Sequence, residues 1–246
     1  MNNVFKEFRP DCVFHLAAVS SLSSKDAQET KDVNIFGTSN VLEASVNSKA
    51  KRIIFSSSAA VYGNASKFPT DENQKLNPIN EYGISKAKAE SQIISSSKKY
   101  GLNYTILRLS NAYGPRQRYD NEGGVVSIFA HKIANNQPII IYGNGHQTRD
   151  FVAVSDVVLA NMLAVKKTDS LLCNISSKKS TSIERLARMI IETINPQYMQ
   201  KIIYKNSLSC WILHSRLDNE KARHLLGWKP HLMLQSGLIN LLHNSV

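Results

Sequence analysis

Three side chains in the first half of the chain have the types and spacing needed to move a proton. Tyr82 and Lys86 lie four residues apart in the helix-forming stretch NEYGISKAKAE, and this spacing places both on one helical face. A phenol has an unperturbed pKa of about 10, and an ammonium one turn away stabilises its phenolate. Ser58 ends the strand-like run KRIIFSSS, where its hydroxyl can hold a reacting oxygen. Together the three predict proton transfer of the kind that oxidises an alcohol to a ketone.

A second interpretation of the same residues is structural. A single Tyr-x-x-x-Lys is common in helices without a catalytic role, and serine or asparagine after a strand usually forms a turn. The order and spacing of all three residues favour the catalytic interpretation.

The surrounding elements predict how these side chains meet. Apolar strand-like runs alternate with helical stretches, which predicts βαβ units and a parallel sheet. The carboxyl ends of parallel strands form the ligand crevice, and polar Ser58 and Asn111 stand directly after two of the runs. We therefore predict an α/β fold with residues 1–176 as the sheet domain, an insertion at about 111–147, and a smaller lobe at 177–246. The runs are 11–18, 34–48, 51–58, 85–100, 103–110, 127–136, 138–143, 149–167 and 171–176, followed by two helices around 201–205.

Composition narrows the function classes. The 246 residues, 42% of them apolar, are enough for a large buried core. The net charge of +11 is spread as isolated basic pairs rather than one run, so we predict no nucleic-acid partner. No apolar stretch reaches the length of a membrane span or a signal peptide, so we predict a cytoplasmic protein with no membrane partner. Cys12, Cys173 and Cys210 are far apart, which predicts reduced thiols and no metal site.

Seven segments, in order, resemble signatures of the extended short-chain dehydrogenase/reductases. Within that family they are most similar to the nucleotide-sugar epimerase/dehydratase group typified by UDP-glucose 4-epimerase, from about residue 8 to about residue 230. The resemblance implies an NAD-dependent enzyme with a Rossmann-type parallel sheet and a smaller α+β substrate lobe. The segments are HLAA (15–18), NIFGTSNVLEA (34–44), FSSSAAVYG (55–63), YGISK (82–86), LRLSNAYGPRQ (107–117), TRDFVAVSDVV (148–158) and KARHLLGWKP (221–230).

The same resemblance implies the role of each site residue. Tyr82 is the base, Lys86 is its partner and also contacts the nicotinamide ribose, and Ser58 binds the sugar hydroxyl. Residues that line the NAD are Leu16, Ala17, Ala18, Asn34 and Ser56, together with Tyr82 and Lys86.

The substrate implied is a nucleotide-diphosphate sugar. Asn111 and Arg149 meet its phosphates, and the forked, permanently charged arginine suits that contact. Arg216 replaces an arginine that relatives carry near 207–216. The alternative for Arg149 is a surface salt bridge, and Asp156 is expected to be structural.

Two alanines refine the reaction type. Relatives that eliminate water or carbon dioxide carry acidic residues directly after the serine, where this chain has Ala59 and Ala60. An alanine cannot move a proton, so 4-epimerisation by transient oxidation is favoured, with a ketone reductase as the remaining enzymatic alternative.

One family signature is absent. Relatives begin with a strand, a G-x-x-G-x-x-G turn and a helix that holds the pyrophosphate, and the chain lacks this motif. We therefore expect an N-terminally truncated sheet with an exposed edge and weak NAD binding by this chain alone. The competing hypothesis is a catalytically silent relative that binds a nucleotide sugar or a partner chain. The resemblance also implies a homodimer through helices at 30–48 and 82–100.

Overall fold

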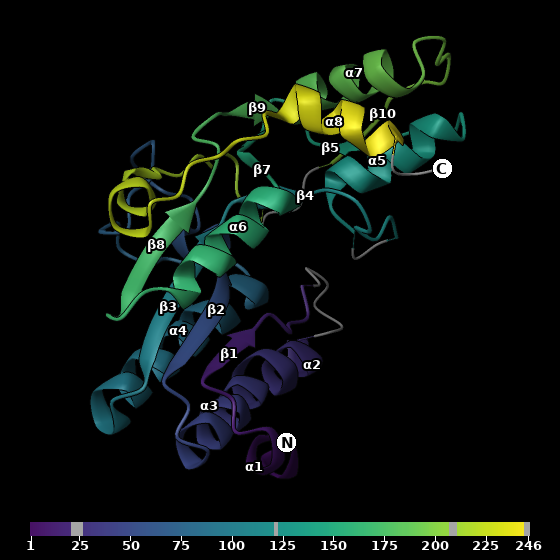
Figure 1. Cartoon of the computed structure of the whole chain (residues 1–246). Coiled ribbons are helices and arrows are strands. Elements are labelled where there is room, and N and C mark those ends of the chain that lie inside the picture. Colours follow the sequence, from purple (N-terminus) through teal and green to yellow (C-terminus); the bar gives the residue numbers. More distant parts are fainter. Residues whose placement is uncertain (21–26, 121–122, 207–210, 244–246) are drawn as a thin grey trace.

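The main sheet contains four parallel strands in the order β1-β2-β3-β8, as the computed structural model in Figure 1 shows. The model describes residues 1–20, 27–120, 123–206 and 211–243. Within them the predicted α/β fold with a parallel sheet is confirmed, and β1 is an edge strand with β2 as its one neighbour. The strands are β1 (Cys12–His15), β2 (Arg52–Ser58), β3 (Asn103–Leu109) and β8 (Leu171–Ile175).

Helices cover the two faces of this sheet because successive β2 side chains point in opposite directions. Ile53 and Phe55 pack with residues of α3 (Gly37–Asn47) and α4 (Glu81–Tyr100) in one core cluster. Ile54 packs on the other face with α6 (Val154–Val165). A continuous apolar run such as RIIF is what a strand buried on both faces requires.

A second core lies between the helices of the C-terminal part. α5 (Val125–Ala134), α7 (Ile183–Ile194) and α8 (Leu234–His243) contribute to one apolar cluster. The sequence analysis missed α8. The domain boundary at 176 stays a prediction. Short paired strands accompany these helices: β4 (Asn111–Tyr113) with β7 (Phe151–Ala153), β5 (Ile140–Tyr142) with β10 (Ile203–Lys205), and β6 (Thr148–Arg149) with β9 (Thr181–Ser182).

Side-chain caps and glycines set the ends of the helices. Asn80 caps α4 by accepting a hydrogen bond from the Gly83 amide at 2.8 Å, so the helix begins beside Tyr82. Ser182 caps the start of α7 by accepting a hydrogen bond from the Arg185 amide, and Gly227, in the left-handed conformation, ends η4. The remaining helical segments are α1 (Asn2–Phe8), α2 (Ala27–Lys31), η2 (Asp32–Phe36), η3 (Ala59–Tyr62) and η4 (Ala222–Leu226).

Two further features bear on the composition argument. Among the described residues, no helix combines the length and apolar character needed to cross a membrane. Cys12 and Cys173 are free thiols, and Cys210 lies outside the described residues.

Candidate active site

Ser58 and Tyr82 meet at the carboxyl end of the sheet. Ser58 is the last residue of β2, and its Oγ caps η3 by accepting a hydrogen bond from the Ala60 amide at 3.1 Å. Tyr82 lies in the first turn of α4, and its phenol is hydrogen-bonded to the Ser58 side chain. Gly83 permits this approach, because a Cβ there would lie 2.5 Å from the Ala60 carbonyl oxygen. The strand end and the helix start therefore bring the two hydroxyls into contact.

Lys86 completes the predicted trio from one turn further along α4. Its buried Nζ donates a hydrogen bond to the Ser56 carbonyl oxygen at 2.8 Å and lies 5.8 Å from the centre of the Tyr82 ring. Burial lowers the pKa of Lys86 to about 8, and the Glu90 carboxylate acts against that shift. Lys86 is thus held beside the phenol at the cost of desolvating its charge.

The electrostatic expectation for Tyr82 is corrected by this geometry. We expected the lysine to lower the pKa of the phenol, but burial raises the pKa of Tyr82, and the hydrogen bond from Ser58 only partly offsets that effect. The Lys86 ammonium lies 5.8 Å from the centre of the Tyr82 ring, and it donates its hydrogen bond to the Ser56 carbonyl oxygen instead of to the phenol. The phenol of Tyr82 is therefore protonated at neutral pH.

Asn34 fixes the loop that follows β1. Its side-chain amide accepts a hydrogen bond from the Val19 amide at 2.8 Å and donates to the Val19 carbonyl oxygen and to Ser85 Oγ, both at 2.9 Å. Ser85 lies between Tyr82 and Lys86 on α4, so one buried amide ties this loop to the helix of the trio.

The loop itself lies open at the sheet rim. Leu16, Ala17 and Ala18 are exposed directly after β1. His15, which precedes them, is buried against Thr38, and desolvation together with the Lys86 charge lowers its pKa to about 4. His15 is therefore neutral at physiological pH.

Asn111 on β4 lies near Arg149 on β6, because the Asn111 amide donates a hydrogen bond to the carbonyl oxygen of Asp150, the next residue, at 2.9 Å. Asn111 pairs with Phe151, two residues after Arg149, and its own side chain is exposed. Arg149 Nη1 donates to the Thr148 carbonyl oxygen at 2.8 Å, and burial lowers the pKa of Arg149 to about 10. Arg149 forms no salt bridge within the described part of the chain, which favours the phosphate-binding role over the surface-pair alternative.

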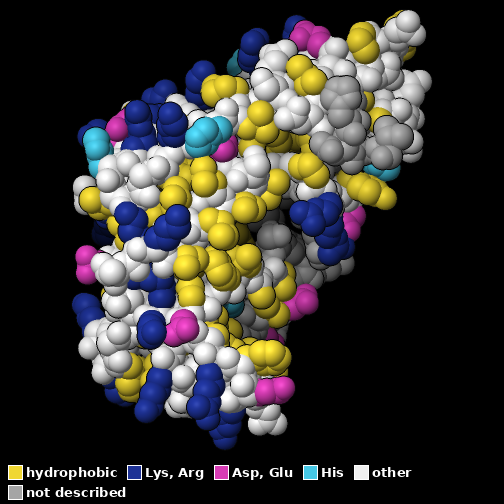
Figure 2. Space-filling model, viewed as in Figure 1, with side chains coloured by type: hydrophobic (Ala, Val, Ile, Leu, Met, Phe, Trp, Pro, Cys, Tyr) yellow, Lys and Arg dark blue, Asp and Glu magenta, His cyan; other side chains and the backbone are white. Residues whose placement is uncertain are grey.

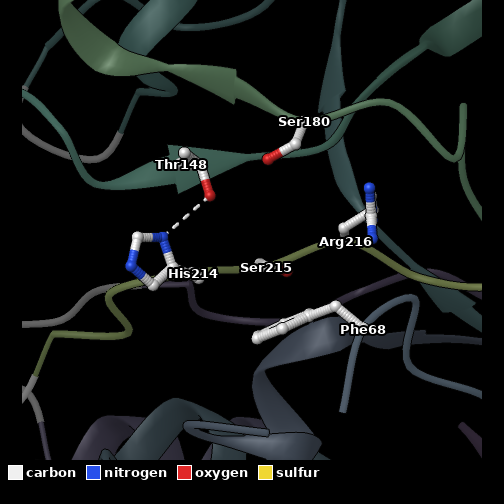
Figure 3. A pocket seen from close by; sticks show the side chains of 6 residues that line it. All are labelled: Phe68, Thr148, Ser180, His214, Ser215 and Arg216. Atoms are coloured by element: carbon white, nitrogen blue, oxygen red, sulfur yellow. Dashed lines mark hydrogen bonds between the residues drawn. The ribbon is translucent and has the colours of Figure 1, made fainter.

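Arg216 and Thr148, the residue before Arg149, line a cavity of about 250 Å³ (Figure 3). The wall comes from segments far apart in the sequence, and within it Thr148 Oγ1 lies 3.1 Å from His214 Nδ1. Arg149 reaches the same segment, with Nη1 3.5 Å from the Leu213 carbonyl oxygen. The other lining residues are Phe68, Ser180 and Ser215.

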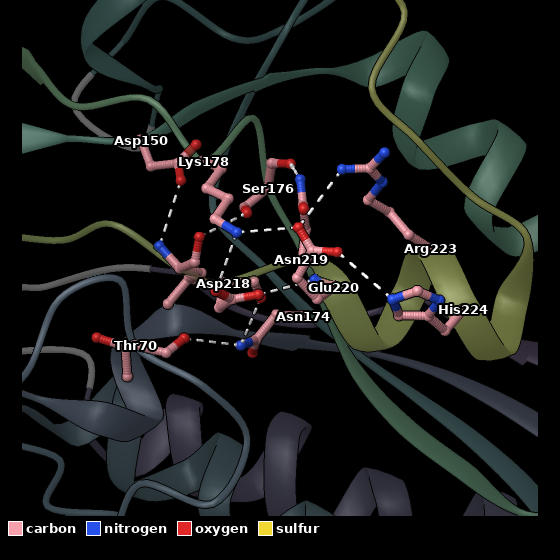
Figure 4. Close-up of polar contacts among 11 residues, drawn as sticks. Thr70, Asp150, Asn174, Ser176, Lys178, Asp218, Asn219, Glu220, Arg223 and His224 are labelled. Carbon is pink, nitrogen blue, oxygen red and sulfur yellow. Dashed lines mark hydrogen bonds and ion pairs between the residues drawn. The ribbon is translucent and has the colours of Figure 1, made fainter.

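The segment that carries Arg216 is anchored by buried polar contacts (Figure 4). The Asp150 carboxylate accepts hydrogen bonds from the Leu217 amide at 3.3 Å and the Ser177 amide at 2.9 Å, while Asn174 Nδ2 donates to the Asp218 carbonyl oxygen at 3.1 Å. Lys178 pairs with the Asp218 carboxylate at 3.1 Å. This anchoring fixes Arg216 relative to the end of β8.

One buried pair beside the site was missed by the sequence analysis. Arg108 on β3 makes a two-pronged contact with Glu90 on α4, with Nη2–Oε2 2.7 Å and Nε–Oε1 3.0 Å. Ser57 Oγ also donates to Glu90 Oε1 at 2.5 Å, one residue before Ser58. Two signals were present in the sequence: Glu90 lies one turn after Lys86, and Arg108 interrupts an apolar strand.

Known proteins match this arrangement over nearly the whole chain. Residues 1–175 match the NAD dependent epimerase/dehydratase family. The chain belongs to that family. Its members are enzymes, and NAD is their cofactor. The Asp156 carboxylate accepts hydrogen bonds from the His231 and Leu232 amides at 3.1 Å, as the expected structural role requires.

Individual relatives of this epimerase/dehydratase include UDP-glucose 4-epimerases. The protein of Mycolicibacterium smegmatis with that name is 31% identical over 97% of the chain and 77% of its own length. A Methanocaldococcus jannaschii relative, named provisionally as the same enzyme, is 41% identical over 84% of the chain and 67% of its own length. The UDP-glucose 4-epimerase of Thermotoga maritima was solved with UDP-glucose and is 37% identical, with a TM-score of 0.95. The match covers 99% of this chain and 80% of the Thermotoga maritima chain.

The residues of this epimerase/dehydratase fit part of an NAD molecule. The open loop 16–18, the Asn34 clamp and the buried Lys86 ammonium line one rim, as the nicotinamide ribose requires. The pyrophosphate needs a helix N-terminus approached through small residues, and the chain has no G-x-x-G-x-x-G turn to provide it.

Proposed function

We propose that the protein is a nucleotide-sugar 4-epimerase that uses Ser58, Tyr82 and Lys86. The hydrogen bond between Ser58 and Tyr82, with Lys86 one turn away at the sheet rim, carries this proposal. The relatives that bind or convert UDP-glucose support the substrate class.

The chemistry of the step follows from these residues. Tyr82 takes the proton of the sugar hydroxyl that Ser58 holds in line, while the hydride leaves the carbon that bears this hydroxyl and a ketone forms. When bound, NAD would supply the hydride acceptor for this oxidation and the hydride source for the reduction that follows once the sugar has turned. Lys86 stabilises the phenolate once the site closes and water leaves. The residues at 59 and 60 are alanines, which favours epimerisation over elimination of water.

The substrate phosphates would lie against Arg149 and Asn111. Arg149 is a desolvated cation that donates hydrogen bonds to the Thr148 and Leu213 carbonyl oxygens, so an incoming diphosphate offers it an anionic partner. Arg216, held by the anchored segment, is assigned to the same substrate. Loop 16–18, Asn34 and Ser56 are assigned to the NAD.

The test is conversion of UDP-glucose to UDP-galactose at about 10 mM NAD, followed by chromatography of the sugar nucleotides. A positioned general base contributes about 10²–10⁴ to a rate, so Tyr82→Phe should lower conversion at least 100-fold. Tyr113→Phe is the matched control, because Tyr113 is a buried tyrosine outside this site. If the wild type forms no galactose epimer, or if both variants lose activity equally, the assignment is wrong.

A ketone reductase is the second candidate. The dTDP-4-dehydro-6-deoxyglucose reductase of Escherichia coli is 33% identical over 89% of the chain, which favours it as the alternative. That enzyme class would release a reduced sugar and consume the cofactor. Two results together would identify a reductase: reduced cofactor is consumed when a 4-keto sugar is supplied, and no epimer forms in the UDP-glucose assay.

We further propose that the enzyme works in the cytoplasm as a homodimer. The free thiols of Cys12 and Cys173 fit a cytoplasmic location. The helices α3 and α4, which contact each other, offer a surface for the dimer. Light scattering of the purified protein tests the mass of the assembly.

A further inference from the structure

Lys86 and Glu90 form a pair of buried charged side chains on α4. The lysine and arginine side chains visible in Figure 2 project from the surface, whereas Lys86 is only 3% exposed and Glu90 only 2% exposed. Residues four apart lie on the same face of a helix, so the two are neighbours along the buried side of α4. Buried charges are screened far less than exposed ones, so each of these groups acts on the other.

Two strands hold Glu90 in place. Arg108 on β3 contacts both of its oxygens, with Nη2–Oε2 2.7 Å and Nε–Oε1 3.0 Å. Ser57 Oγ on β2 donates to Oε1 at 2.5 Å. Arg108 Nη1 also donates to Tyr62 OH at 2.9 Å, and burial raises the pKa of Tyr62 to about 12, so that phenol is neutral. The Glu90 carboxylate therefore has a fixed position beside Lys86.

Ser57 connects Glu90 to the strand end that carries the candidate active site. The residue before it, Ser56, accepts the hydrogen bond from Lys86 Nζ at 2.8 Å. The residue after it, Ser58, is hydrogen-bonded to the phenol at the start of α4. One carboxylate is thus tied to the segment of β2 that holds both the ammonium and the phenol.

The other groups that face Lys86 carry no charge at neutral pH. His15 on β1 is neutral, because desolvation and the Lys86 charge lower its pKa to about 4. The Tyr82 phenol is protonated, because burial raises its pKa. The Phe55 ring of β2 lies 4.7 Å from Nζ. Glu90 supplies the negative charge, and it offsets part of the desolvation that lowers the pKa of Lys86.

We propose that Glu90 is a positioning residue for the proposed reaction and that it acts by keeping Lys86 charged. The inference rests on the proposed function for its catalytic meaning, because an ammonium stabilises the Tyr82 phenolate and a neutral amine does not. The pKa of Lys86 is about 8 with the carboxylate in place. Loss of the carboxylate would leave Lys86 mostly neutral at the pH where the enzyme works.

The test measures the titration of Lys86 directly, in the full chain with no ligand added. NMR of protein labelled with ¹³C at the lysine Cε carbons follows the amines from about pH 6 to about pH 10, and the signal missing from Lys86→Met identifies Lys86. We expect a midpoint of about 8 in the wild type and of about 7 or lower in Glu90→Gln. Loosening of the site would have the opposite effect, because a solvated lysine titrates at 10.5.

A second variant keeps the test available if Glu90→Gln does not fold. The double variant Glu90→Gln/Arg108→Met removes the ion pair as a unit, so neither charge is left buried without a partner. Its Lys86 midpoint should still lie below the wild-type value, because Glu90 is the charge that raises the pKa of Lys86. Circular dichroism checks that each variant is folded before the titration.

Two controls separate the charge of Glu90 from its contacts. Ser57→Ala removes a hydrogen bond to Glu90 and leaves the carboxylate present. Glu81→Gln removes an exposed carboxylate at the start of the same helix. Both variants should keep the Lys86 midpoint within about 0.3 of the wild-type value, because the buried charge is unchanged in the first and the lost charge is screened by water in the second.

The activity assay adds a readout that a purely structural role would not change. In the UDP-glucose assay, the loss of activity in Glu90→Gln should be about 5-fold greater at about pH 8 than at about pH 6, where Lys86 stays charged in both proteins. A wild type that forms no epimer would contradict the proposed function and would leave the titration result as it is.

Two titration results would overturn the role of Glu90. An unchanged Lys86 midpoint in Glu90→Gln and in the double variant would show that the carboxylate does not act on the lysine. A rise toward 10.5 would show that Glu90 only packs α4 against the sheet and that its loss lets water reach Lys86.

Discussion

Glu90 and Arg108 form a buried, two-pronged ion pair directly beneath the end of β2, with Nη2–Oε2 2.7 Å. Ser57 and Tyr62 bond to the same pair, with Ser57 Oγ–Glu90 Oε1 2.5 Å and Arg108 Nη1–Tyr62 OH 2.9 Å. The pair thereby joins α4, β2 and β3 around the site of Ser58. Removing one partner leaves the other charge buried without compensation.

We therefore expect Glu90→Gln to lower the free energy of unfolding by about 3–5 kcal/mol, measured by urea denaturation. Arg108→Met should lower the free energy of unfolding by a similar amount. The double variant Glu90→Gln/Arg108→Met should cost less than the sum of the two single changes by about 1–3 kcal/mol. Strict additivity would show that the two side chains do not stabilise each other.

Lys86 should reduce stability at neutral pH, because its pKa is about 8 in the folded protein and 10.5 in the reference state. Between these values the unfolded chain binds more protons than the folded chain, so this group makes stability rise with pH. Below pH 8 the full desolvation penalty is present. Lys86→Met should then raise the free energy of unfolding at pH 7 by about 1–2 kcal/mol, after the lost bond to Ser56 is counted.

The measurement is urea unfolding at pH 7 and pH 10. The advantage of Lys86→Met should shrink at the higher pH, where the wild-type penalty is mostly relieved. Lys88→Met is the control on the exposed side of the same helix, and it should show no such change between the two pH values. A less stable Lys86→Met at pH 7 would mean that the bond to Ser56 outweighs desolvation.

The sequence was sufficient for the parts of the structure that local spacing determines. Apolar runs and their alternation with helices predicted the parallel sheet, and the strand end and helix start predicted that Ser58 and Tyr82 meet. Asn34 was singled out in the sequence as a residue beside the NAD, and its two bonds to Val19 show that it holds the loop after β1.

Other features depend on packing that local spacing does not encode. Arg108 and Glu90 meet only because β3 and α4 adopt one register across the sheet. The direction of the Tyr82 pKa shift is a balance between burial and the hydrogen bond with Ser58, and burial prevails in the folded protein. The cavity at Arg216 needs segments around residues 68, 148, 180 and 214 to assemble, and no motif marks that meeting.

Arg149 should bind the substrate diphosphate more than it supports the fold. Its hydrogen bonds go to the Thr148 and Leu213 carbonyl oxygens, and within the described residues it has no carboxylate partner. Arg149→Gln should weaken UDP-glucose binding 10- to 100-fold by calorimetry, which corresponds to about 1.4–2.8 kcal/mol. It should change the free energy of unfolding by less than about 1 kcal/mol.

The control is Arg188→Gln, which removes an exposed arginine paired with Glu184 on α7. It should leave UDP-glucose affinity unchanged at the same ionic strength. Equal losses of affinity in both variants would indicate a general effect of net charge instead of a contact at Arg149.

NAD affinity is the last prediction, and it depends on the pyrophosphate. Loop 16–18 and Lys86 can meet the nicotinamide ribose, but the chain offers no glycine-rich turn where backbone amides hold two phosphates. The diphosphate carries most of the charge of the cofactor, so binding through the ribose alone should be weak. We expect a dissociation constant above about 1 mM by calorimetry for this chain by itself. Micromolar binding would contradict this expectation and would require another set of residues to hold the pyrophosphate.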